Sequence, residues 1–165
     1  EILTEKYGFE KVSIGKIMRK MAEEHQMTVA DFNRYIEQHP KYDKIVDDKL
    51  KSYEEKSGKF LFDSRMAWHF VPSSFSIYMQ VDIKTSAERI MNASRSDESY
   101  KDVDTAIAEL KKRRESEILR YNTLYNVDIM DMNNYDLVVD TNGKTPNEVA
   151  DYIIKNFENW LKRKV

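Results

Sequence analysis

Short strand candidates alternate with helix candidates along most of this 165-residue chain. Hydrophobic runs or apolar alternation predict strands at about residues 9–14, 59–63, 75–83 and 137–139. Helical periodicity and end signals predict helices at about residues 16–26, 29–38, 42–56, 86–92, 103–125 and from 145 onward. Because parallel strands need crossover connections, which are usually helices, this order predicts an α/β fold with a mostly parallel sheet.

Composition limits the kind of protein that this fold builds. The chain is one domain's worth of polypeptide, and we assign a single domain to residues 1–165. Its 27 basic and 29 acidic residues give a net charge of -2, which argues against a nucleic-acid partner. No run approaches the roughly 18 apolar residues that span a bilayer, so no membrane partner is expected. With no cysteine, thiolate metal sites and disulfides are excluded, and we expect a soluble cytoplasmic protein.

Charged and polar residues follow two of the expected strands directly. Asp63 ends the apolar run at 59–63, and Arg65 comes two residues later. Open α/β sheets bind ligands outside the carboxyl ends of their strands, so both residues are candidates for a ligand site. Ser13 would stand at the end of the first strand, with Arg19 about one turn into the next helix. For Arg19 alone, a surface salt bridge is the simpler interpretation.

A second group of arginines lies on the helix expected at 103–125. Arg113, Glu117 and Arg120 share one face of that helix. With 34% charged residues in the chain, this face is either a solvated, salt-bridged surface or a mobile arm that closes on a phosphoryl group.

Trp68 would line a pocket or pack in the core, and we favour the core. His25, His39 and His69 lack metal-ligand spacing, so no metal site is expected.

Five short segments, in order and with their spacing, resemble the cytidylate kinase family of nucleoside monophosphate kinases, most of all its archaeal type. They are Val-Ser-x-Gly-x-Ile-x-Arg at 12–19, Asp-x-Arg at 63–65, Glu-Arg-Ile at 88–90, Arg-Arg-Glu-Ser-Glu-x-x-Arg-Tyr at 113–121 and Tyr-Asp-Leu-Val-Val at 135–139. The resemblance covers about residues 7–154. It implies a three-layer P-loop NTPase fold, with a helical monophosphate-binding insert at about 28–57 and a lid at about 93–121.

The resemblance also implies roles for individual residues on the acceptor side. Ser13, Arg19 and Arg65 match positions that hold the acceptor nucleotide, the two arginines on its phosphate. Asp63 matches an acidic position beside that phosphate. Within the insert, Asp43 and Asp47 are the candidates for reading the base.

On the donor side, the resemblance implies that Arg113 and Arg120 are lid arginines that close on the donor and acceptor phosphates. Arg95 matches an arginine near the donor adenine. The implied reaction transfers the terminal phosphoryl group of ATP, with Mg²⁺, to CMP or dCMP. A kinase for another small phosphoryl acceptor, or a non-catalytic nucleotide-binding module, remains as an alternative.

Two departures from the family pattern stand out. Ser64 occupies the place of a usual glycine before the arginine. The phosphate loop Gly-x-x-x-x-Gly-Lys-Ser/Thr does not occur in the 165 residues. We expect it, with the first strand of the sheet, in about twenty residues upstream of residue 1.

Overall fold

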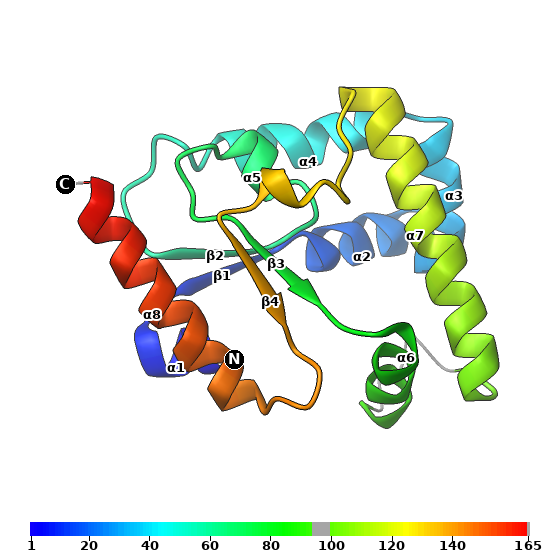
Figure 1. Ribbon diagram of the computed structural model, residues 1–165. Coiled ribbons are helices and arrows are strands. Elements are labelled where there is room, and N and C mark those ends of the chain that lie inside the picture. Colours follow the sequence, from blue (N-terminus) through cyan, green and yellow to red (C-terminus); the bar gives the residue numbers. More distant parts are fainter. Residues whose placement is uncertain (94–99, 165) are drawn as a thin grey trace. The chain divides into compact units, whose positions relative to one another are not determined.

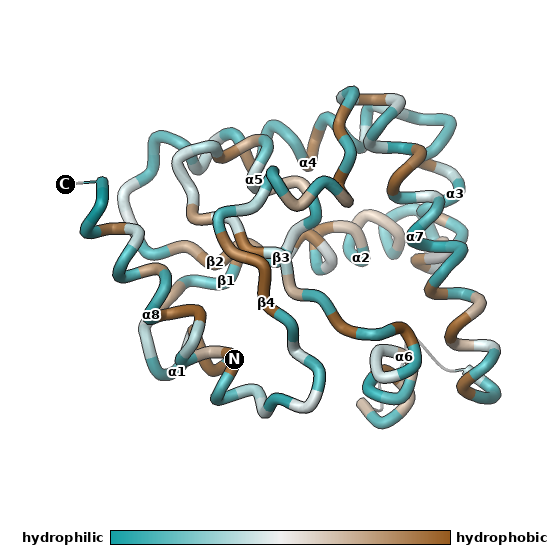
Figure 2. Tube along the Cα trace, in the orientation of Figure 1, coloured by the Kyte–Doolittle hydropathy of each residue, from teal (hydrophilic) through white to brown (hydrophobic). Residues whose placement is uncertain are grey.

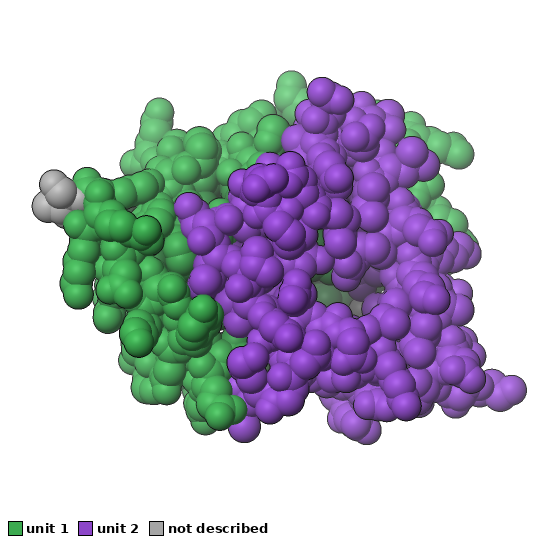
Figure 3. All heavy atoms as spheres, viewed as in Figure 1, with its two compact units in different colours: residues 1–76, 146–165 green, residues 77–145 purple. Residues whose placement is uncertain are grey.

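The computed structural model describes residues 1–93 and 100–164 and divides into two compact units (Figures 1 and 3). The first unit joins the two ends of the chain, Glu1–Ser76 and Pro146–Val165, and the second is Ile77–Thr145. The first contains α1 (Ile2–Tyr7), β1 (Glu10–Ser13), α2 (Ile14–Glu24), α3 (Val29–Glu37), α4 (Lys41–Lys51), β2 (Phe60–Asp63), α5 (Ala67–Phe70) and α8 (Pro146–Lys164). The second contains β3 (Ile77–Gln80), α6 (Ile83–Asn92), α7 (Val103–Tyr125), the 3₁₀ turn η1 (Met132–Asn134) and β4 (Leu137–Asp140).

The first unit is built on the parallel pair β1 and β2, which lie side by side in Figure 1. Their register sets Ser13 opposite Asp63, so the carboxyl ends of both strands reach the same edge. At the other end of β1, α1 stops at Gly8, whose φ of 72° is the left-handed conformation that glycine adopts without strain.

Helix α8 returns to this unit and packs beside α1. The Lys6 ammonium and the Tyr7 hydroxyl both donate to Asp151 Oδ1, at 2.8 and 2.7 Å. The Phe9 and Phe157 rings meet edge to face with centroids 5.8 Å apart, which adds an aromatic contact to the polar one. The first and last helices of the described chain are therefore joined.

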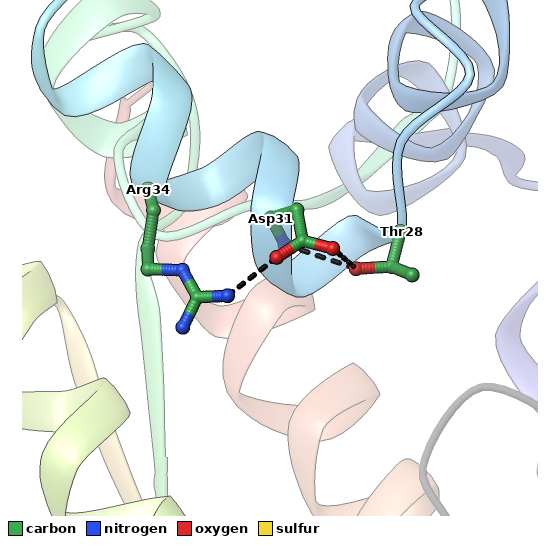
Figure 4. Close-up of polar contacts among 3 residues, drawn as sticks. All are labelled: Thr28, Asp31 and Arg34. Carbon is green, nitrogen blue, oxygen red and sulfur yellow. Dashed lines mark hydrogen bonds and ion pairs between the residues drawn. The ribbon is translucent and has the colours of Figure 1, made fainter.

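A hydrophobic cluster of side chains from α2, α3 and α4 forms the core of the helical part of this unit. Phe32 and Ile36 of α3 are almost completely buried, and Met21, Ala22 and Tyr42 surround them. Thr28 begins α3: its hydroxyl oxygen accepts from the Asp31 amide at 3.1 Å while its proton goes to the Asp31 carboxylate (Figure 4). Arg34 contacts the same carboxylate, so the first turn of α3 is held by its own side chains.

The second unit has its own parallel pair, β3 and β4, in which Met79 is opposite Val139. The hydrophobic run of β4 stands out in Figure 2. Val139 is 2% exposed and Met79 is 59% exposed, so only part of this sheet's apolar surface is covered. Helices α6 and α7 both start at an aspartate: Asp82 accepts from the Thr85 amide at 2.8 Å, and Asp102 from the Thr105 amide at 2.7 Å.

The predicted α/β class with parallel strands is confirmed, and the helix at 103–125 has the predicted bounds. Helix α4 ends at Lys51 rather than at 56, because the amides of Tyr53 and Glu54 bond three residues back and tighten the chain into turns. The predicted strand at 75–83 is wrong at both ends. Phe75 packs instead against the Phe157 and Trp160 rings of α8, while Asp82 is already the cap of α6.

Within the described residues, no helix combines the length and the apolar character that crossing a membrane requires.

Candidate functional site

The carboxyl edge of the β1–β2 pair carries polar side chains from both strands. Ser13 and Asp63 are register partners there, and neighbouring strands lie about 4.8 Å apart. Lys11, two residues before Ser13 and so on the same face of β1, forms an ion pair of 3.1 Å with Asp63. Sequence reasoning missed Lys11, although its period-two spacing from Ser13 was the available signal.

Arg19 lies close to this edge because α2 follows β1 without a loop. The helix expected from about residue 16 begins at Ile14, so Gly15 is already in the first helical turn. A Cβ placed on Gly15 would be 3.7 Å from Arg19 Nη1 and 3.8 Å from Ser13 Oγ. The Arg19 guanidinium and the Ser13 hydroxyl therefore gather over the same glycine.

Arg65 is exposed on the turn that follows β2. The hydroxyl of Ser64, the residue that replaces the family's glycine, accepts from the Met66 amide at 3.2 Å. The Trp68 indole nitrogen donates to the Arg65 carbonyl at 3.1 Å. The prediction that Trp68 is a core residue is only partly right, because its ring is half-buried and its polar atom is engaged with Arg65.

The two candidate base-reading aspartates lie one turn apart on α4. Asp47 is 9% exposed, and one Asp43 carboxylate oxygen is inaccessible to solvent. One turn further along, the Lys51 ammonium lies 5.1 Å from the centre of the Phe70 ring of α5. Because residues four apart share a helix face, Asp47 is on the side of α4 that faces α5, the helix that follows Arg65.

His69 of α5 is adjacent to this region. Burial lowers the pKa of its imidazole, and the positive charge of Lys51 lowers it further. The ring is therefore neutral over more of the physiological range than an ordinary histidine.

Arg113 and Arg120 lie on α7 in the second unit. Arg113 Nε donates to Glu117 Oε1 at 3.2 Å, which is the ion pair expected of a salt-bridged helix face. The Arg120 guanidinium lies 4.9 Å from the centre of the Tyr121 ring and donates to its hydroxyl at 3.1 Å. Both guanidiniums thus have fixed neighbours on their own helix. The predicted contact Arg95 lies outside the described residues.

Two further arginines of the second unit were missed by sequence reasoning. Arg89, within the Glu-Arg-Ile motif, donates to both the hydroxyl and the carbonyl of Thr141, at 3.1 and 2.8 Å. Arg114 donates to the Tyr78 hydroxyl at 3.3 Å and ties α7 to β3. No spacing in the sequence links either pair, since the partners are 52 and 36 residues apart.

The structure brings Ser13, Arg19 and Asp63 to one edge of the first unit, and Arg65 follows Asp63 by two residues. Guanidinium groups bind phosphate through paired, charge-assisted hydrogen bonds, and a hydroxyl can add a further bond. The arrangement therefore suits a small phosphorylated ligand. In the described part of the chain, no group of three or more His, Asp or Glu residues could hold a metal ion.

Comparisons with known proteins show which family this chain is similar to. The sequence profile of the cytidylate kinase-like family matches residues 1–143. A cytidylate kinase of Methanobrevibacter smithii is 33% identical over 93% of this chain and 87% of its own length. One from Methanothrix thermoacetophila is 34% identical over 84% of this chain and 77% of its length.

A relative with another name also matches. An S-adenosylmethionine-dependent nucleotide dehydratase of Lacinutrix mariniflava is 31% identical over 94% of this chain but only 32% of its own length. No solved structure matches the chain.

Proposed function

Because the chain belongs to the cytidylate kinase-like family, we propose that it transfers the terminal phosphoryl group of ATP to CMP or dCMP. The products are ADP and CDP or dCDP. The observation that carries this proposal is the gathering of Ser13, Arg19 and Asp63 at one edge of the first unit, with Arg65 on the turn that follows Asp63. The two arginines can bind a monophosphate there, and the kinase reaction is inferred from membership of the family.

On the acceptor side, Arg19 and Arg65 hold the CMP phosphate and Ser13 donates a hydrogen bond to the nucleotide. Asp63 stands beside this phosphate and, through its ion pair with Lys11, keeps a third cation near the edge. Phosphoryl transfer requires little covalent chemistry from the protein. The work of these residues is to orient the attacking phosphate oxygen and to offset its charge.

The helical segment at about 28–57 acts as the insert that closes over the monophosphate, and Asp43 and Asp47 read the cytosine from it. The burial of Asp47 on the α5 side of α4 supports this assignment. A buried carboxylate suits the exocyclic amino group of cytosine, which is a hydrogen-bond donor.

The segment at about 93–121 acts as the lid. Arg113 and Arg120 leave their contacts with Glu117 and Tyr121 to neutralise the oxygens of the transferring group. Stabilisation of those oxygens by arginine contributes on the order of a thousandfold or more to such rates. The whole chain then forms one P-loop kinase domain with a three-layer fold.

The donor side needs a further strand and a phosphate loop, which we place upstream of residue 1. In the described part of the chain β2 pairs only with β1, and β3 only with β4, so each strand has an edge with which another strand can pair. Magnesium would arrive with the ATP phosphates and offset their charge. We assign it no residue of this chain, since the described residues contain no cluster that fits a metal.

A kinase with another acceptor is the second candidate. One relative is named a nucleotide dehydratase, and this chain matches 32% of its length, so the names of the relatives do not by themselves determine the acceptor base. Both candidates use the phosphate edge in the same way. They differ in the base that Asp43 and Asp47 recognise.

Acceptor competition tests the proposal. The full-length protein is incubated with ATP and Mg²⁺ and with CMP, dCMP, UMP, AMP or GMP, and ADP formation is measured for each. The highest kcat/KM with CMP or dCMP supports the first candidate, and a preference for another base selects the second. Binding of a monophosphate without ADP formation would show a nucleotide-binding module instead.

A further inference from the structure

The turn after β2 has an unusual hydrogen-bond arrangement. The amides of His69 and Phe70 both bond to the Met66 carbonyl, at 3.1 and 3.3 Å. The carbonyl of Arg65 instead accepts the indole N–H of Trp68, at 3.1 Å. A side chain thus supplies the hydrogen bond at the peptide of Arg65.

This contact matters because the secondary structure around Arg65 is short. Helix α5 has four residues, and one turn of helix is not stable on its own. Arg65 itself is exposed, so burial does little to fix its backbone. The Ser64 hydroxyl accepts from the Met66 amide and the Trp68 indole donates to the Arg65 carbonyl, so side chains hold both polar groups of the Arg65–Met66 peptide.

We propose that Trp68 is a positioning residue for Arg65. Its indole N–H fixes the Arg65 peptide, and thereby directs the guanidinium toward the acceptor phosphate at the β1–β2 edge. The inference rests on the proposed function, since it assigns Arg65 to that phosphate. Trp68 itself need not touch the nucleotide.

A purely structural role for Trp68 predicts different behaviour. The ring is half-buried and lies edge to face with His69, with centroids 5.7 Å apart, so removal of the whole side chain would also disturb packing. Removal of the N–H alone separates the two roles. Loss of packing lowers stability, whereas loss of positioning lowers the affinity for the phosphorylated acceptor.

The test measures CMP binding by calorimetry and steady-state kinetics in the full-length protein. Trp68→Phe keeps an aromatic ring and removes the donor. We expect about tenfold weaker CMP binding, the upper range for one hydrogen bond, and a raised KM for CMP. The KM for ATP and kcat should change little. Trp160→Phe is the matched control. Trp160 packs on Phe75 and Phe157 at the far end of α8, so this variant should bind CMP like the wild type.

A double-mutant cycle shows whether Trp68 acts through Arg65. In the Arg65→Ala background, Trp68→Phe should weaken CMP binding by less than twofold, because the side chain that it positions is gone. Equal effects in both backgrounds, or wild-type CMP affinity in Trp68→Phe, would overturn the proposal.

A second variant covers the case in which Trp68→Phe does not fold. In the Trp160→Phe protein, the remaining tryptophan is replaced biosynthetically by benzothienylalanine, which has nearly the same shape but sulfur in place of N–H. The same loss of CMP affinity is expected, and unchanged affinity contradicts the proposal.

Solvent exchange of the Trp68 indole hydrogen in the wild type tests the contact without nucleotide. Slow exchange is expected, and exchange as fast as in an unstructured peptide would refute the contact and leave the proposed function untouched. Failure of the wild type to bind any monophosphate, with the indole still protected, would refute the proposed function instead, and the role of Trp68 with it.

Discussion

Arg65 carries the most specific assignment at the scale of single residues. It is exposed beyond β2, and two neighbouring side chains hold its backbone. We predict that Arg65→Ala raises the KM for CMP by about 10- to 100-fold, the range for losing hydrogen bonds to a charged group. The KM for ATP should stay near the wild-type value, because the proposal assigns ATP to a separate donor side. Steady-state kinetics with each substrate varied in turn checks this.

Arg163→Ala is the control for Arg65→Ala. Arg163 is also exposed in the first unit, but it lies on α8, outside the proposed insert and phosphate edge, and donates to the Asn159 carbonyl of its own helix. CMP kinetics like those of the wild type are expected for it. A normal KM for CMP in Arg65→Ala would remove Arg65 from the acceptor site.

Arg120 is expected to affect turnover rather than acceptor binding. Its guanidinium lies over the Tyr121 ring, on the helix that we assign to the lid. Arg120→Ala should lower kcat by about a thousandfold, if the side chain stabilises the transferring phosphoryl group. The KM for CMP should change little. Lys112→Ala, an exposed cation on the same helix, should retain the wild-type kcat, and a normal kcat in Arg120→Ala would argue for a structural role.

At the scale of elements, side-chain caps set where several helices begin. Thr28 both donates to and accepts from Asp31 at the start of α3. Thr28→Ala should lower the free energy of unfolding by about 1 kcal/mol, the usual cost of losing an N-cap. Urea unfolding measures this change. Thr28→Ser keeps the hydroxyl and should lose less, and equal losses in the two variants would mean that the methyl group, not the cap, is responsible.

The contact between α1 and α8 depends on pH. Hydrogen bonds from Lys6 and then Tyr7 lower the pKa of Asp151, and the bond to Asp151 raises the pKa of Lys6. A lowered carboxyl pKa gives stability that is present above the unfolded value of 3.8 and is lost as the pH falls through the folded value. For Lys6, with its raised pKa, the stability is present below 10.5 and is lost as the pH rises through the folded value. The contact is therefore strongest between these limits.

Asp151→Asn tests this contact. At pH 7 and low salt its thermal midpoint should be lower than that of the wild type, and the difference should shrink as the pH falls below 3.8. Glu158→Gln removes one carboxylate from the same helix and should show a smaller difference at pH 7. A difference between Asp151→Asn and the wild type that does not change with pH would mean that the charge of Asp151 is not involved.

Local signals predicted the elements better than the contacts. Thr28 with Asp31 correctly marked the start of α3, because a cap is encoded within four residues. The cap of α6 at Asp82 was missed, since apolar alternation extended the strand through it. The links from Arg89 to Thr141 and from Tyr7 to Asp151 join residues far apart in sequence, and only the folded chain reveals them.

At the scale of the whole molecule, the proposed reaction depends on chain beyond these residues. We predict that the protein purified from its native source has a mass at least about 2 kDa above 19.6 kDa, because a strand and phosphate loop of about twenty residues would add that much. Intact-mass spectrometry measures this directly. A native mass of 19.6 kDa would contradict the upstream loop and favour the nucleotide-binding module.

Only some residues of the candidate site could be predicted from the sequence, and the others were found only in the structure. The arginine motifs selected Arg19 and Arg65, because each follows a recognisable strand. The pairing of Ser13 with Asp63 needed the register of two strands that are separated by three helices. Lys11 and Trp68 contact the site through bonds that no motif encodes.

The first unit is discontinuous, since α8 joins it from the far end of the chain. A ribosome therefore makes Ile77–Thr145 before it makes the helix that pairs with α1 and contacts Phe9 and Phe75. Because domains tend to fold in the order in which they are made, the second unit can fold while the first still waits for its last helix. The packing of α8 on α1, Phe9 and Phe75 would then be among the last contacts of the first unit to form, so a translation product interrupted before residue 146 would lack it.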